Sequence, residues 1–186
     1  MKRTILLLCI LIMGTTAFCI SLGLFGSCCR VKKETTKISY FHHTNSGAAR
    51  YTSVGIGPTL LRWSYSEARN NVHMRDSVEY DEKEFNDLID KLSKISFYIG
   101  EEDRRLGGAG FSFSFKDNDD TYLSFDSSQI SSEECQEVVN LIRQFISIHQ
   151  TRCEQLFKKY ASKPHKRAHF GEFDVLPQEL EKYLVK

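Results

Sequence analysis

Residues 111–115 read Phe-Ser-Phe-Ser-Phe, and this stretch constrains the fold more than any other part of the chain. Successive side chains of a β-strand point to opposite faces of a sheet, so the three phenylalanines share one face and Ser112 and Ser114 share the other. An Asp-Asn-Asp-Asp turn follows at residues 117–120, and residues 122–125 return as the partner strand. The pattern predicts an antiparallel hairpin with a phenylalanine-lined core face.

A helix is predicted upstream of this hairpin, over residues 81–95. Its apolar side chains recur three and four positions apart, which places them on one helical face. Asp81 can cap its first turn, and Glu84 stands three residues later, at the spacing of a capping box. Residues 96–99 then fit a short strand.

A second, longer helix is predicted downstream, over residues 131–160. Its apolar stripe includes Cys135 and Cys153. Neither Gly nor Pro occurs between residues 145 and 152, so we expect the helix to be continuous. Eighteen residues of helix would hold the two thiols about 27 Å apart, too far for a disulfide.

The region before the first helix favours strands. Residues 38–42 and 50–56 have the composition of strands, residues 59–65 fit either a strand or a helix, and residues 66–76 are polar and expected to be partly helical. The predicted fold class is therefore α+β, with a small antiparallel sheet packed against two main helices and preceded by an apolar N-terminal export or anchor segment.

The chain divides into four parts by composition. Residues 1–29 form a signal peptide, a lipoprotein signal or a membrane anchor, and residues 30–37 form a basic and polar linker. Residues 38–162 form the α+β domain. Residues 163–186 form a basic linker that leads to a short C-terminal helix, expected from Pro177.

The N-terminal segment has the layout of an export signal. Lys2 and Arg3 are followed by residues 4–29, which carry no charge. Three outcomes stay open: cleavage near residues 15–17, retention of residues 5–25 as a membrane helix, and lipidation. All three place the protein at or beyond a membrane, and we expect the domain to lie outside the cytoplasm, in the periplasm or at the cell surface.

The lipidation outcome depends on five residues. Residues 24–28 read Leu-Phe-Gly-Ser-Cys and resemble a bacterial lipobox, the export signal in which a Cys follows small residues and becomes acylated. Gly26 and Ser27 are suitably small, whereas Phe25 stands where Leu is usual. The resemblance makes Cys28 the lipidation candidate.

Charge argues against a nucleic-acid partner. Five basic residues precede Glu34, the first acid, and the other 20 of the 25 bases are outnumbered by the 24 acids that follow. A mildly acidic domain lacks the excess of cations that neutralises phosphates. Acidic stretches at residues 76–103 and 117–137, and a basic one at 158–169, indicate either ordinary solvated faces or a surface for a protein partner.

Metal and cofactor signatures are absent from the sequence. His42 and His43 are adjacent in a predicted strand and would point to opposite faces. Residues 117–120 lack the Gly and the later Glu of a helix–loop–helix calcium site. Residues 107–110 are glycine-rich but lack the Lys-Ser/Thr that completes a phosphate-binding loop. We predict no metal, cofactor-binding or catalytic residues.

A non-enzymatic, membrane-tethered binding domain is the leading hypothesis, of the lipoprotein or the inhibitor and immunity type, with the membrane and a protein as its partners. The rival hypothesis is a small envelope hydrolase whose site is assembled from scattered residues such as His42, His43, His73 and Arg62. A deep pocket with convergent polar groups would favour the enzyme, and a flat or acidic face the binding domain. Cys153 and His149 are close enough in sequence to touch, but both are expected in the core.

Overall fold

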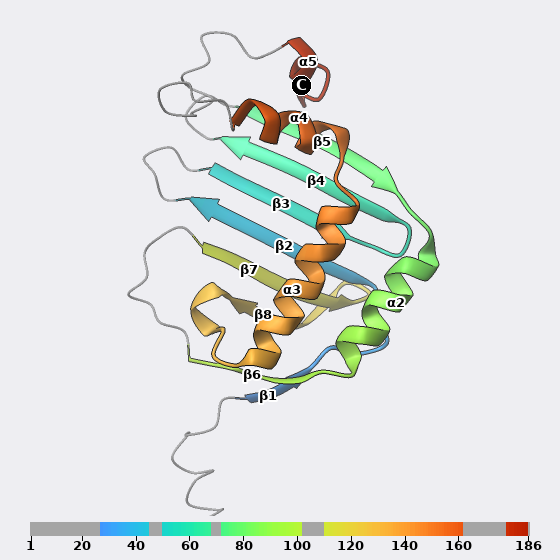
Figure 1. Ribbon diagram of the computed structural model, residues 1–186, viewed down its shortest axis with the longest axis vertical. Helices are drawn as coiled ribbons and strands as arrows, with labels where there is room; N and C mark the ends of the chain where they lie inside the picture. Colours follow the sequence, from blue (N-terminus) through green and yellow to red (C-terminus); the bar gives the residue numbers. More distant parts are fainter. Residues whose placement is uncertain (1–26, 45–49, 68–71, 102–109, 162–177, 186) are drawn as a thin grey trace, which may run out of the picture.

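A computed structural model describes residues 27–44, 50–67, 72–101, 110–161 and 178–185 of the chain (Figure 1). The strands are β1 (Ser27–Arg30), β2 (Lys37–Thr44), β3 (Arg50–Ile56), β4 (Leu60–Glu67), β5 (Val72–Glu79), β6 (Ser96–Ile99), β7 (Gly110–Asp117) and β8 (Asp120–Asp126). The helices are α2 (Glu82–Ser93), α3 (Glu133–Ile148), α4 (Arg152–Ala161) and α5 (Gln178–Glu181), with a 3-10 turn, η1, at Ser127–Gln129. The predicted α+β class is confirmed.

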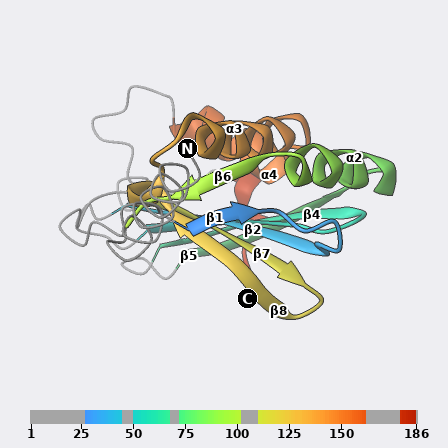
Figure 2. The same ribbon diagram turned by 90° about the horizontal axis from the view of Figure 1, so that it is seen from below.

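Six strands form one antiparallel sheet in the order β5-β4-β3-β2-β7-β8, and β1 pairs with β6 in a second, two-stranded sheet. Helices α2, α3 and α4 lie together on one face of the large sheet (Figures 1 and 2). Burying one face of an antiparallel sheet under helices while the other faces outward is a common two-layer solution. The core therefore lies between the helices and this inner face.

The predicted hairpin forms as β7 and β8, and its face assignment is confirmed. Phe113, Phe115 and Phe125 are buried against the helices, whereas Ser112 and Ser114 lie on the outer face. Asn118 in the turn adopts a positive φ of 53°, a conformation that Asn tolerates better than most residues. The Asp-rich stretch is thus explained by the turn.

Helix α2 also follows the prediction. The Asp81 carboxylate accepts a hydrogen bond from the Lys83 backbone N–H at 2.8 Å and caps the first turn. The apolar stripe from Phe85 to Leu92 is buried, and Phe97 of β6 is fully buried next to it. Local sequence is sufficient here because both the cap and the stripe lie within one helix.

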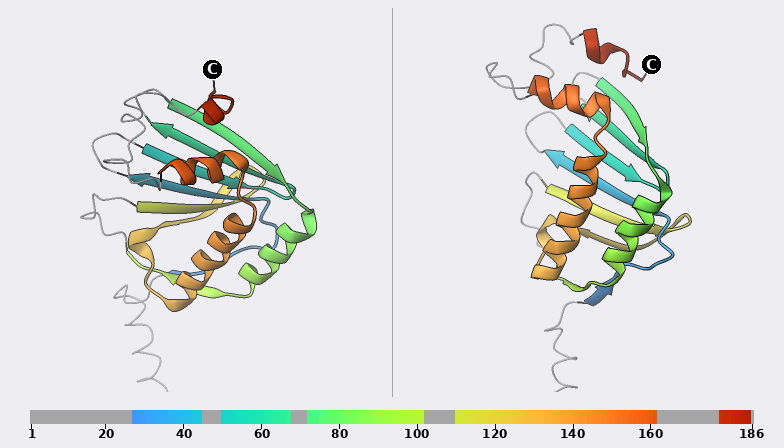
Figure 3. Two further views of the ribbon diagram at one scale, coloured as in Figure 1. Left: turned by 45° about the horizontal axis from the view of Figure 1, so that its top comes forward. Right: turned by 45° about the vertical axis from the view of Figure 1, so that its right-hand side comes forward.

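The prediction of one continuous helix over residues 131–160 is wrong. Helix α3 ends at Ile148, His149 leaves helical geometry with a ψ of 41°, and α4 begins at Arg152 (Figure 3). Two groups cap the start of α4: the Thr151 hydroxyl accepts from the Glu154 N–H at 3.2 Å, and the Asp76 carboxylate of β5 accepts from the Cys153 N–H at 2.8 Å.

The chain breaks there without Gly or Pro because the new helix packs well in its new direction. Phe157 of α4 lies 4.7 Å from Tyr65 and 5.8 Å from Trp63, ring centroid to ring centroid. Burying the Phe157 side chain against these two rings stabilises the fold by more than the early end of α3 costs. Cys135 and Cys153 are both buried, free thiols.

Of residues 66–76, expected to be partly helical, the described residues 66–67 and 72–76 belong instead to the end of β4 and to β5. Met74 is fully buried and Val78 packs against the core, while His73 and Ser77 alternate with them on the exposed side. The alternation is that of a strand with few apolar residues. Polar residues dominate because the outer face carries no cover within the described part of the chain.

The ends of the described chain are integrated into the fold. Val31 and Thr35 are buried, so residues 30–37, predicted as a linker, contribute to the interior. The predicted C-terminal helix ends at Glu181, because Leu184 forms an antiparallel bridge with Met74 at the edge of β5. Of residues 1–29, predicted as an export or anchor segment, residues 1–26 lie outside the described residues and residues 27–29 belong to β1. Within the described ranges, no helix is both long and apolar enough to cross a membrane.

Candidate functional site

The outer face of the six-stranded sheet is the most distinctive surface of the described chain, because all the helices that cover the sheet lie on its other side (Figure 2). Strand register defines which side chains stand side by side on this face. One row across the strands consists of Ser77, Arg62, Gly55, Ser39, Ser114 and Ser124. The next row consists of Arg75, Ser64, Ser53, Phe41, Ser112 and Asp126.

These two rows form a band, which we call the serine trough, and most of its side chains are short; the long ones are Arg62, Arg75 and Phe41. Neighbouring strands lie about 4.8 Å apart, so six strands give the trough a length of about 24 Å across the sheet. The Oγ atoms of Ser53 and Ser64 lie 2.7 Å apart, within hydrogen-bonding distance. Gly55 has no side chain, and the Lys37 side chain passes near the space above it. Short residues next to one another leave a hollow.

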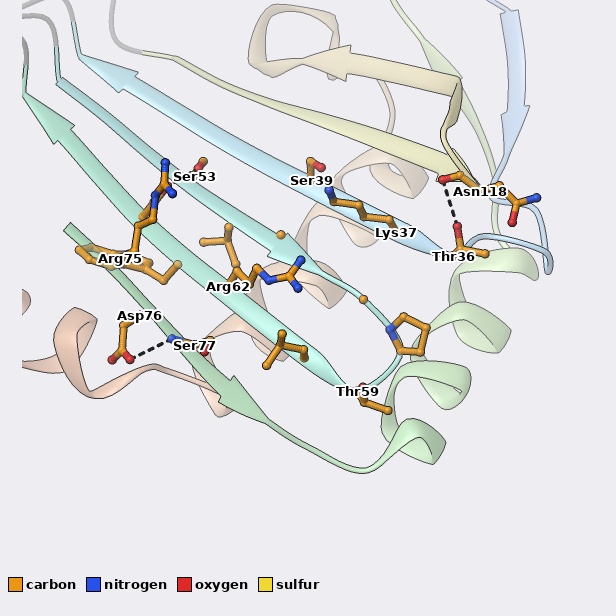
Figure 4. A pocket seen from close by; sticks show the side chains of 17 residues that line it. Thr36, Lys37, Ser39, Ser53, Thr59, Arg62, Arg75, Asp76, Ser77 and Asn118 are labelled. Atoms are coloured by element: carbon orange, nitrogen blue, oxygen red, sulfur yellow. Dashed lines mark hydrogen bonds between the residues drawn. The ribbon is translucent and has the colours of Figure 1, made fainter. Parts of the chain in front are cut away.

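A depression of about 1010 Å³ occupies the β2–β5 end of the serine trough (Figure 4). Its polar lining consists of Thr36, Lys37, Ser39, Ser53, Thr59, Arg62, Ser64, Arg75, Asp76, Ser77 and Asn118. Hydroxyl groups and cations therefore dominate the lining. Such groups donate hydrogen bonds to oxygen-rich ligands.

Three cations, Lys37, Arg62 and Arg75, rise from this face around the depression (Figure 4). None of them forms an ion pair with another residue in the described ranges. Asp76 is the one carboxylate in the lining, and its oxygens accept from the backbone N–H groups of Ser77 at 2.9 Å and Cys153 at 2.8 Å. These hydrogen bonds hold the Asp76 carboxylate at the start of α4. With three cations and one carboxylate, the lining of the depression has a net positive charge.

Aromatic rings lie in and beside the serine trough: Phe41 belongs to its second row, and Tyr51 lies beside it on β3. Phe41 stacks on Tyr51 at 5.5 Å and on His43 at 6.2 Å between ring centroids. Phe41 and Tyr51 are 37% and 38% exposed, unusually high values for large aromatic side chains on a sheet. Exposed aromatic residues next to arginines are typical of protein-binding surfaces.

The residues of the hydrolase hypothesis do not converge. His42 lies on the inner face, where burial, helped by the nearby charges of His43 and Arg143, lowers its pKa. His43 is on the outer face of β2, and His73, whose Nδ1 lies 3.1 Å from the Ser66 Oγ, is on the outer face of β5. Three strand spacings, about 14 Å, separate His43 from His73. Only Arg62 reaches the depression.

The pair formed by Cys153 and His149 is also not a catalytic pair. The His149 Nε2 lies 3.2 Å from the Glu84 Oε2 at the α2–α3 contact. Burial, together with the charge of Asp76, raises the pKa of the Cys153 thiol to about 12. A thiol that stays protonated is a poor nucleophile. Among the described residues, no three His, Cys, Asp or Glu side chains are grouped so as to hold a metal ion.

Cys28, the lipidation candidate, is exposed in β1 and pairs with Tyr98 of β6, which is 45% exposed. Cys29 faces the other way and is half-buried beside the core. β1 therefore begins at Ser27, one residue before the position where an acylated chain would begin. Most of the glycine-rich stretch at 107–110 lies outside the described residues.

Sequence reasoning missed the serine trough. A signal was present, because serines recur at alternate positions of β4 and β7 and face large buried residues such as Trp63 and Phe113. Comparison of the chain with known protein families, with curated proteins and with solved structures finds no match.

Proposed function

We propose that the protein is an exported, membrane-tethered binding module, of the lipoprotein or the inhibitor and immunity type, that holds a protein partner on the outer face of its six-stranded sheet. One observation carries the proposal: the uncovered face has unpaired cations, hydroxyls and exposed aromatic rings around a broad depression. A face of this kind suits recognition, because its polar groups are exposed and ready to contact a second surface.

The tether rests on the N-terminal sequence, in which an uncharged segment follows Lys2 and Arg3. β1 contains the last residues of this segment, and the exposed Tyr98 stands beside Cys28. Tyr side chains favour the water–membrane interface. An anchored N-terminus would leave the large sheet free to meet a partner.

Non-enzymatic binding is favoured over the hydrolase because the titratable residues of the outer face are dispersed. General acid–base chemistry needs a proton donor or acceptor within hydrogen-bonding reach of the reacting atom and a partner that orients it. His43 and His73 sit on β2 and β5, with two strands between them. The depression itself is lined by cations and hydroxyls without a histidine.

Site-specific photocrosslinking in the host cell tests this function. A photoreactive phenylalanine analogue at position 114 reports on the serine trough, and the same analogue at exposed position 137 on α3 is the matched control. We expect a discrete protein adduct from position 114 and none from position 137. Identical adducts from both positions, or none from position 114, would show that this face does not bind a protein.

A further inference from the structure

The cations in and beside the serine trough are arranged in like-charge pairs. Lys37 of β2 stands directly opposite Lys116 of β7, and Arg62 and Arg75 are diagonal neighbours on β4 and β5. Like charges at such positions on a sheet repel each other and destabilise it. The described residues supply no ion-pair partner to any of the four. An anion from a binding partner, placed between the cations, would offset this repulsion.

The acids on the same face do not provide that balance. Asp126 accepts hydrogen bonds from the backbone N–H and the hydroxyl of Ser128, which commits it to the start of η1. Glu79 lies at the edge of the sheet, opposite Leu60. This local excess of cations stands out because the chain beyond residue 33 carries more acids than bases. The basic face is thus a local feature and does not follow from overall charge.

The geometry points to carboxylates as the groups that are recognised. An Arg guanidinium donates two parallel hydrogen bonds to one carboxylate, and Lys adds a third cation at the same depression. Serine hydroxyls of the serine trough supply further donors. Diagonal neighbours on paired strands lie about 7–8 Å apart, close to the spacing of alternate residues in an extended chain. Acids at every second position of an extended segment therefore match Arg62 and Arg75.

We infer that the serine trough binds an extended acidic segment of a protein partner, with Glu or Asp at alternate positions set on Arg62 and Arg75 and a further acid set on Lys37, which is two strands away from Arg62. The inference rests on the proposed function and specifies the chemistry of its partner. The length of the trough, about 24 Å, accommodates about seven extended residues. Phe41 and Tyr51 border the bound segment and provide apolar contact beside the charges.

Fluorescence anisotropy with the full-length protein in detergent tests the inference. The probe is a labelled octapeptide of alternating Glu and Ser, compared with the Gln-Ser octapeptide of the same length. We expect binding of the Glu-Ser peptide alone, weakened as NaCl rises from about 20 to about 150 mM, since salt screens exposed charges. Arg62→Gln and Arg75→Gln should each weaken it by about tenfold, the loss of one charge-assisted contact.

Matched variants separate this site from general attraction. Lys91→Gln removes the same charge from an exposed position on α2, on the helical side of the molecule, and should leave binding unchanged. Arg62→Lys keeps the positive charge but loses the planar guanidinium that donates two parallel hydrogen bonds. This variant should therefore bind the Glu-Ser peptide more weakly than the native protein and more tightly than Arg62→Gln does. Thermal unfolding of each variant verifies that the fold is kept, as expected for exposed positions.

Several outcomes would overturn the inference. Equal losses from Arg62→Gln and Lys91→Gln would mean nonspecific attraction, and equal binding of the Gln-Ser peptide would exclude carboxylate recognition. Preferential binding of an eight-nucleotide oligothymidylate, lost in Phe41→Ala and Tyr51→Ala, would assign the face to single-stranded nucleic acid. Absence of peptide binding together with a crosslink from position 114 would overturn the acidic segment and keep the proposed function. Absence of both would overturn the two together.

Discussion

At the scale of single residues, alternation between large and small side chains gives the two faces of the sheet their different roles. Phe113 is buried under the helices, and its neighbours Ser112 and Ser114 lie in the serine trough. Trp63 and Ser64 divide in the same way on β4. The same few residues therefore build the core on one side and a candidate binding surface on the other.

The burial of Phe113 leads to a first prediction. Phe113→Asp should lower the free energy of unfolding by roughly 3 kcal/mol or more, because it places a charge without a partner in the core and removes an aromatic side chain. Ser112→Asp, one position away on the outer face, should change it by about 0.5 kcal/mol. Urea denaturation of both variants measures the difference. Similar losses would contradict the assignment of the faces.

The two buried thiols lead to a second prediction. Burial raises the pKa of Cys135 to about 11 and that of Cys153 to about 12, against an ordinary value of 9.0. The native state thus holds these protons more tightly than the unfolded chain. Their contribution to stability is complete below pH 9 and is lost as the pH rises from about 9 toward 12.

Alkylation followed by peptide mapping checks this prediction. In the native protein at pH 8, both thiols should react slowly, and denaturation should make them react at the ordinary rate. The exposed Cys28 provides the internal comparison, if the mature chain retains an unmodified thiol there. Rapid reaction of Cys153 in the native state would contradict its burial. A Cys135–Cys153 crosslink in the unreduced protein would contradict the free thiols.

At the scale of secondary-structure elements, the bend between α3 and α4 shapes the molecule most. α3 spans the sheet, and α4 turns to lie over β4 and β5, where Phe157 contacts Trp63 and Tyr65 (Figure 3). Asp76 joins the two layers at this point. It belongs to a strand of the sheet and accepts a hydrogen bond from the first turn of α4.

Asp76 therefore carries the third prediction. Asp76→Ala should lower the free energy of unfolding by about 1–2 kcal/mol, because it removes a cap and leaves a helical N–H group without its acceptor. Glu79→Ala, an exposed change on the same strand, is the control and should be nearly neutral. Thermal or urea unfolding measures both. An equal, small effect of the two changes would mean that the Asp76 contact does not stabilise α4.

At the scale of the whole molecule, the N-terminal segment and the domain are continuous. β1, which contains the end of the predicted export segment, pairs with β6, and Val31 is buried in the core. A truncation intended to remove the proposed membrane anchor must therefore keep residue 27 onward to preserve these contacts. Cys28, the proposed site of the tether, has an exposed side chain that faces away from the core.

Truncation provides the fourth prediction. The full-length protein should partition with membranes, and a fragment that starts at Ser27 should stay in the aqueous fraction. A fragment that starts at Glu34 should unfold at a lower temperature, because it loses β1 and the buried Val31. Fractionation and circular dichroism measure these outcomes. Uncleaved full-length protein found wholly in the aqueous fraction would contradict the tether.

The sequence by itself determined the features that depend on residues close together in the chain. The β7–β8 hairpin, its core face and helix α2 with its Asp81 cap all follow from local periodicity and capping chemistry. The separation of His42 and His43 onto opposite faces follows from strand alternation in the same way. Each of these needs information from one or two adjacent segments only.

Only the tertiary structure decided the bend after Ile148 and the candidate site. The bend depends on Asp76, which is 77 positions away from Cys153 in the chain. The serine trough depends on the register of six strands, which aligns serines and arginines from separate segments into two rows. Register is set by burial of the inner face, so a shift of one residue would turn the serines inward and the aromatic residues outward. No single segment contains that information, because it arises from the pairing of all six strands.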